Sequence, residues 1–92
     1  MRFLIVEDDD RIAKSLAENL RYQQHIVDIT RDGIEGWEYS QAAEYDFILL
    51  DIMLPKLGGI KLYHRLRANN SKVLIQAYFI LDSGKVFTYF EP

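Results

Sequence analysis

Short apolar runs alternate along the chain with stretches in which apolar and polar residues mix, and this alternation is typical of an α/β protein. Each apolar run is rich in aliphatic or β-branched side chains and is bounded by polar residues, which predicts a buried strand. Strands of a parallel sheet are apolar on both faces because helices cover both sides of the sheet. The predicted strands span residues 3–6, 25–30, 46–50 and 73–81.

The stretches between these runs predict helices. Ile12, Leu16 and Leu20 recur at every fourth position, with charged residues on the other faces, which indicates an amphipathic helix with one apolar stripe. The order of strands and helices favours right-handed crossovers and a parallel sheet. The other predicted segments are a turn at 31–33 and helices over 34–43 and 60–67.

The last part of the chain has a different pattern. Residues 82–85 are typical of a turn, and residues 86–90 are aromatic or β-branched, which favours a strand. The connection between the two final runs is too short for a helical crossover, so we expect them to form an antiparallel β-hairpin. The whole chain, residues 1–92, is expected to be a single domain.

Composition narrows the classes of function. The formal net charge is −3, from 14 acidic and 11 basic residues, which argues against direct binding of nucleic acid by this chain. There is no cysteine, so disulfides and thiolate metal sites are excluded. No apolar stretch approaches the roughly 20 residues that cross a bilayer, and none has the pattern of a signal peptide. A soluble cytoplasmic protein with no membrane partner is expected.

Acidic residues follow two of the predicted strands. Glu7 and Asp8 come directly after the first run, and Asp51 directly after the third. The carboxyl ends of parallel strands meet at one edge of a sheet, where such folds bind their ligands. Carboxylates are suitable ligands for Mg²⁺, and an aspartate beside a bound metal can act as a nucleophile toward phosphorus. The alternative is that residues 7–10 only cap the first helix and Asp51 only ends a strand. The matching positions favour the metal site.

The N-terminal four fifths of the chain resemble a known family. The matching segments are residues 3–9, 27–33 and 45–55, with Gly59 and Leu66-Arg67. Their order and spacing over residues 1–73 resemble the receiver domain of two-component response regulators, and the Asp-x-Met-Leu-Pro form resembles receivers attached to winged-helix DNA-binding domains. The resemblance implies a flavodoxin-like fold, with a five-stranded parallel sheet in the order 2-1-3-4-5.

The resemblance also implies roles for individual residues. Asp51 would accept a phosphoryl group from a sensor histidine kinase. Glu7 and Asp8 would form the acidic pair that binds Mg²⁺ together with Asp51, with Asp8 the stronger candidate ligand. Met53 would contribute its backbone carbonyl to the metal.

Residues 74–92 depart from the family pattern. The family has a Ser or Thr at the end of the fourth strand, and the aligned positions here, Ala77, Phe79 or Leu81, carry no hydroxyl. The family's lysine at the end of the fifth strand has only Lys85 as a candidate, which comes much too soon after the fourth strand. We interpret the chain as a truncated receiver with an atypical tail: an incomplete fold of about three βα units, a fourth strand and a hairpin strand.

Three functions compete. The first is a phosphoacceptor receiver of a two-component phosphorelay, impaired by these departures, and the second is a non-phosphorylated receiver remnant that acts only as a protein–protein interaction module. The third, a phosphatase with an aspartyl-phosphate intermediate, is disfavoured because Met53 stands where that class has a second acid, so no enzyme is expected.

The tail either packs on the sheet or drives self-association as a homodimer. Its aromatic residues are Tyr78, Phe79, Phe87, Tyr89 and Phe90.

Overall fold

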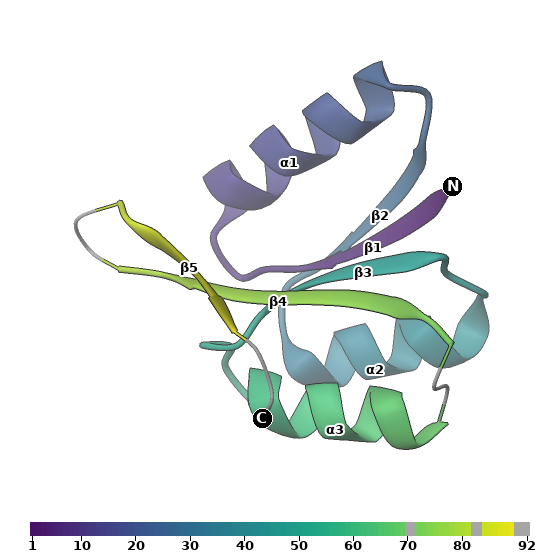
Figure 1. The fold of residues 1–92 in the computed structure, drawn as a ribbon, viewed down its shortest axis with the longest axis vertical. Helices are drawn as coiled ribbons and strands as arrows, with labels where there is room; N and C mark the ends of the chain where they lie inside the picture. The colour runs from purple at the N-terminus through teal and green to yellow at the C-terminus, as the bar shows by residue number, and fades with distance from the viewer. Residues whose placement is uncertain (70–71, 82–83, 90–92) are drawn as a thin grey trace.

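Five β-strands lie side by side in one sheet in the computed structural model, which describes residues 1–69, 72–81 and 84–89 (Figure 1). The elements in chain order are β1 (Arg2–Val6), α1 (Asp10–Tyr22), β2 (Ile26–Thr30), α2 (Gly33–Ala42), β3 (Phe47–Asp51), α3 (Gly59–Asn69), β4 (Leu74–Ile80) and β5 (Val86–Tyr89). The strand order is β2-β1-β3-β4-β5, which is the order that the family resemblance implies. Within the described part of the chain, no helix combines the length and apolar character that a membrane crossing requires.

The direction of the last strand separates this sheet from a fully parallel one. β2, β1, β3 and β4 run parallel to one another, but β5 pairs antiparallel with β4. The turn between them is closed by the Gly84 N–H, which donates to the Leu81 carbonyl at 2.8 Å, and by the Leu81 N–H, which donates to the Lys85 carbonyl at 2.9 Å. Gly84 has a φ of 85°, a conformation that glycine adopts without a steric penalty. The predicted hairpin is confirmed.

Helices cover both faces of the sheet, α1 on one side and α2 with α3 on the other (Figure 1). Successive strand residues therefore serve opposite layers, which explains the continuous apolar runs. In β1, Leu4 and Val6 pack in the layer that includes Leu62 and Leu66 of α3. The layer beneath α1 is smaller and contains Phe3, Ile5, Ala13, Ala17 and Val27. Burial of each large aliphatic side chain contributes roughly 1.5–3 kcal/mol.

Two aspartates determine where the first two helices begin. The Asp9 carboxylate accepts hydrogen bonds from the backbone N–H groups of Arg11 and Ile12 at 2.9 and 3.3 Å, so Asp9 is the N-cap of α1. Asp32 caps α2 in the same way and accepts from the Glu35 N–H at 2.8 Å. The predicted turn at 31–33 is therefore wrong at its last residue, because this cap places Gly33 in the first turn of α2.

The C-terminal elements differ slightly from their predicted bounds. α3 continues to Asn69, and β4 ends at Ile80, one residue before the predicted end. α1 packs on β1 and β2 and leaves Leu74 of β4 54% exposed. The prediction that aromatic residues of the tail pack or associate cannot be followed for all of them, because Phe90 and the side chains of Phe87 and Tyr89 lie outside the described residues.

Candidate metal and phosphoacceptor site

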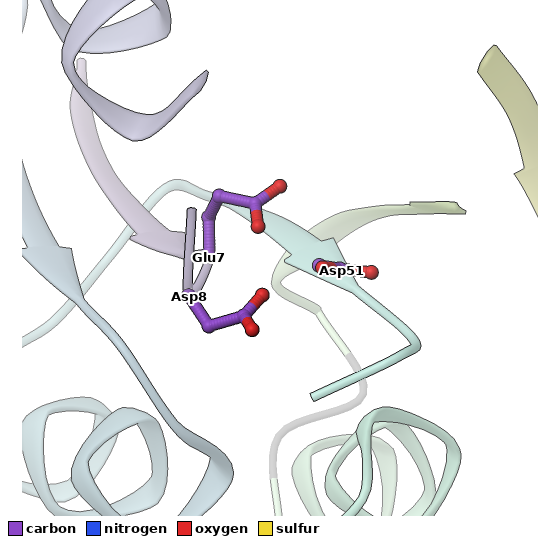
Figure 2. A group of neighbouring side chains, drawn as sticks. All are labelled: Glu7, Asp8 and Asp51. Atoms are coloured by element: carbon purple, nitrogen blue, oxygen red, sulfur yellow. The ribbon is translucent and has the colours of Figure 1, made fainter. Parts of the chain in front are cut away.

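Three carboxylates converge at the carboxyl ends of β1 and β3. Val6 pairs with Leu50 in the parallel register, so Glu7, the residue after β1, comes level with Asp51, the last residue of β3. One carboxylate oxygen from each of Glu7, Asp8 and Asp51 lies within 4.8 Å of the others. Figure 2 shows the carboxylates of Glu7 and Asp8 extending toward Asp51 at the end of β3. The structure thus brings together the three acids that the sequence pattern singles out.

The site is half buried. Glu7 is 2% and Asp51 8% exposed, whereas Asp8 is exposed to solvent. The three acids line an open pocket of about 740 Å³. Apolar side chains from α1 and the hairpin also line this pocket, namely Ile12, Leu16, Ile80 and Leu81.

Backbone donors hold two of the carboxylates in place. The Met53 N–H donates to Oδ1 of Asp51 at 2.9 Å, and the Asp9 N–H donates to Oε2 of Glu7 at 3.1 Å. Glu7 is also fixed through its own backbone, since its N–H donates to the Thr30 carbonyl at 2.9 Å. Backbone N–H groups therefore help to orient both carboxylates.

Electrostatic strain follows from burying like charges together. Burial, with the neighbouring charge of Asp51 as a further cause, raises the pKa of Glu7 to about 7, although hydrogen bonds from Asp9 and Tyr78 oppose the rise. Burial also raises the pKa of Asp51; the charge of Asp8 adds to this rise, and the Met53 N–H opposes it. Among the described residues, no lysine or arginine forms an ion pair with any of these acids. A divalent cation would supply the missing positive charge, so the donor set fits Mg²⁺.

The loop after Asp51 is held by two close backbone contacts. A Cβ on Gly59 would lie 2.2 Å from the Ile52 Cα and 2.5 Å from the Asp51 carbonyl oxygen. A Cβ on Gly33 would lie 1.8 Å from the carbonyl oxygen of Leu57. Only glycine permits these approaches, which explains why α2 and α3 begin at glycines beside the loop of residues 52–58.

The acidic run after β1 divides into two roles. Asp9 caps α1, and Asp10 pairs with Arg31 at 2.6 Å, so the carboxylates of these two acids have partners outside the group of Glu7, Asp8 and Asp51. Glu7 and Asp8 are left for the site. The structure shows the Met53 N–H bonded to Asp51, and the role of the Met53 carbonyl as a metal ligand stays a prediction.

The structure adds one residue that the sequence pattern missed. Ala77 lies opposite Leu50, as a residue of the α2–α3 layer, and the next residue, Tyr78, lies opposite Asp51. The Tyr78 hydroxyl donates to Oε1 of Glu7 at 2.8 Å, and the Tyr78 side chain is only 7% exposed. Burial and this carboxylate both raise the pKa of Tyr78, so the phenol stays a donor. A hydroxyl therefore reaches the acidic site from Tyr78, a position that the alignment with the family pattern does not select.

Comparison with known proteins agrees with this architecture. The family model for the response regulator receiver domain matches residues 3–80. Protein RcaC of Microchaete diplosiphon is 51% identical over 75 residues, which cover 82% of this chain and 12% of RcaC. The receiver domain of the Francisella response regulator 1452 has a TM-score of 0.81 at 28% identity, over 88% of this chain and 67% of that one.

A second solved relative is the response regulator TrrA of Thermotoga maritima. Its structure in complex with Mg²⁺ and BeF has a TM-score of 0.74 at 28% identity, over 87% of this chain and 66% of that one. Its structure in complex with the histidine kinase ThkA has a TM-score of 0.77 at 26% identity, over 83% of this chain and 66% of that one.

The fold and the acids at its strand ends define a flavodoxin-like α/β domain of the receiver type. The chain belongs to the response regulator receiver domain family. It spans about a third or less of the length of the first curated relatives it matches.

Proposed function

We propose that this chain is the phosphoacceptor of a two-component phosphorelay and that Asp51 receives the phosphoryl group from a sensor histidine kinase. The observation that carries the proposal is the position of Asp51, buried at the end of the central strand with Glu7 and Asp8 beside it. The complex of TrrA with a histidine kinase supports the choice of donor. Family membership favours this role over the alternative of a non-phosphorylated remnant.

The proposed reaction is an in-line transfer. The Met53 N–H holds Oδ1 of Asp51, so we assign the attack to Oδ2. A bond forms between Oδ2 and phosphorus while the bond from phosphorus to the kinase histidine nitrogen breaks, and the electron pair leaves with that nitrogen. Because no described lysine or arginine pairs with Asp51, we expect the transfer to be slow for a receiver.

We assign Mg²⁺ as the cofactor and Glu7, Asp8 and Asp51 as its side-chain ligands, with the Met53 backbone carbonyl as a further ligand. The ion would offset negative charge on the transferring phosphoryl group. The fit rests on two buried carboxylates and one exposed carboxylate that share a pocket without a basic side chain of the described residues paired to them. The Mg²⁺ and BeF complex of TrrA supports the same choice of ion.

Receiver domains are generally signal transducers rather than enzymes, and we place this chain in that class. We further propose that residues 1–92 act as one receiver-like domain in the cytoplasm, with residues 74–92 as its atypical part. On this proposal the chain does not bind nucleic acid itself. A homodimer would form through the hairpin strand β5 at the edge of the sheet.

The test is phosphorylation by a small phosphodonor. The purified chain is incubated with Mg²⁺ and acetyl phosphate, and intact mass spectrometry follows the addition of one phosphoryl group. Asp51→Asn should abolish the addition, and Asp46→Asn, which changes an aspartate just before β3, should retain it. Chelation of Mg²⁺ should remove most of the product. A folded wild-type chain that stays unmodified would contradict the proposal.

A further inference from the structure

Tyr78 joins the acidic site from a strand that contributes none of the three carboxylates. It lies on β4 directly opposite Asp51, and its backbone carbonyl accepts a hydrogen bond from the Ile52 N–H at 2.9 Å. Its position is therefore fixed from the same stretch of backbone that carries the acceptor aspartate. From there its hydroxyl reaches Oε1 of Glu7, and both side chains are buried.

Both oxygens of Glu7 are held by donors from different elements. Tyr78 binds Oε1 from β4, and the Asp9 N–H binds Oε2 from the loop before α1. An ionised carboxylate has about four acceptor positions, so each oxygen keeps one for a cation. The two donors restrict the rotation of the Glu7 carboxylate without using all of its acceptor capacity.

We propose that Tyr78 is a positioning residue of the metal site, whose hydroxyl holds the Glu7 carboxylate in the orientation that binds Mg²⁺. This inference deepens the proposed function, since it rests on Mg²⁺ binding by the acids. A carboxylate held in advance loses little side-chain freedom when the cation binds, and groups that orient a metal ligand typically change affinity by about 10- to 100-fold.

The chain contains a matched control. The Tyr45 hydroxyl donates to Oδ2 of Asp28 at 2.5 Å, which is the same kind of bond at the opposite end of the strands. If both hydroxyls served only the packing of the fold, removal of either one would change stability and neither removal would change the affinity for Mg²⁺. Tyr78→Phe and Tyr45→Phe therefore remove equivalent atoms, and only the first removal should change metal binding.

The experiment measures the Kd for Mg²⁺ by calorimetric titration of five folded proteins. They are the wild type, Tyr78→Phe, Tyr45→Phe, Glu7→Ala and the double variant Glu7→Ala, Tyr78→Phe, which completes the cycle. Tyr78→Phe should raise Kd by about tenfold, and Tyr45→Phe should leave it unchanged. In the Glu7→Ala background, Tyr78→Phe should cause no further change, because the carboxylate it positions is gone.

An unchanged Kd in Tyr78→Phe would overturn the inference, and so would a tenfold loss that persists without Glu7. Should Tyr78→Phe not fold, NMR of the wild type decides: Mg²⁺ should shift the ring resonances of Tyr78 in a saturable way and leave those of Tyr45 in place, and unmoved Tyr78 resonances overturn the inference. A wild type that binds no Mg²⁺ overturns it as well. A wild type that binds Mg²⁺ but accepts no phosphoryl group contradicts only the proposed function.

Discussion

The two ends of the sheet contain the same kind of hydrogen bond, a tyrosine hydroxyl donating to a carboxylate, in opposite electrostatic settings. At the amino ends of the strands, Tyr45 donates to Asp28, and Arg2 pairs with the same carboxylate at 3.2 Å. The Arg2 guanidinium also lies over the Tyr45 ring, 5.2 Å from its centroid, and the Arg2 backbone N–H donates to Asp46 at 2.8 Å. The charge of Asp28 is thus balanced by an arginine of the chain, and we refer to this end of the sheet as the balanced end.

At the carboxyl ends, Tyr78 donates to Glu7, but three carboxylates gather without a described arginine or lysine paired to them. The first network pairs its carboxylate with a cation of the chain and serves the fold, although the Arg2 Nε is buried without a hydrogen-bond partner among the described residues. The network at the carboxyl ends has no cation of the described residues paired to it, so a bound metal ion would have to supply the positive charge. This property is expected of a metal site. Charge balance, rather than hydrogen bonding, distinguishes the structural end from the functional end.

The largest expected effect on stability comes from the close approach of Gly59 to the backbone that follows β3. In Gly59→Ala the new Cβ would meet the backbone of Ile52 and Asp51 at 2.2 and 2.5 Å, so the loop must move. We expect a loss of about 3 kcal/mol in the free energy of unfolding, measured by urea denaturation. Gly58→Ala is the control, because its Cβ would have no heavy atom within 4 Å. Equal losses in the two variants would show that the close approach has no energetic weight.

Much of this functional end follows from the sequence. Runs that are apolar on both faces predict parallel strands, and parallel strands place the residues that follow them at one edge. The juxtaposition of Glu7 and Asp51 therefore needs only the register of β1 against β3. The hairpin is likewise predictable, because residues 82–85 leave no room for a crossover helix.

Tyr78 was not predictable in the same way. Alignment with the family pattern assigns the position of the family's hydroxyl to Ala77, and counting from Asp51 assigns it to Phe79 or Leu81. The β3–β4 pairing instead aligns Tyr78 with Asp51. A run that is apolar on both faces does not reveal which residues point to which layer, so only the pairing register decides. The sequence showed a tyrosine in an aromatic tail, and the structure shows its hydroxyl on a carboxylate.

The second largest expected effect is stabilisation of the folded chain by Mg²⁺, which should depend on the acids at the carboxyl ends of the strands. A cation that binds only the folded chain stabilises it by RT ln(1 + [L]/Kd), which is about 1.4 kcal/mol at ten times Kd. Urea denaturation with Mg²⁺ and with a chelator should show this difference in the wild type. Asp51→Asn should remove most of it, and Asp46→Asn, at the balanced end, should keep it. A stabilisation that survives in Asp51→Asn would place the cation elsewhere.

The smallest effect gives the sharpest contrast, because one chemical change should have opposite signs at the two ends. Without metal, the charge of Asp8 disfavours ionised Asp51, so Asp8→Asn should raise the free energy of unfolding by about 0.5 kcal/mol. Asp28→Asn removes the charge that pairs with Arg2 and weakens the bond from Tyr45, so it should lower the free energy of unfolding by about 1 kcal/mol.

Both variants are unfolded in urea with a chelator and again with Mg²⁺. In excess Mg²⁺ the free energy of unfolding of Asp8→Asn should be lower than that of the wild type. The variant lacks one ligand for the cation, so Mg²⁺ stabilises it less. Asp28→Asn should show the same deficit in both conditions, because its partners lie at the balanced end. A destabilised Asp8→Asn in chelator would mean that the acids do not repel one another, and the distinction between the two ends would then rest on geometry alone.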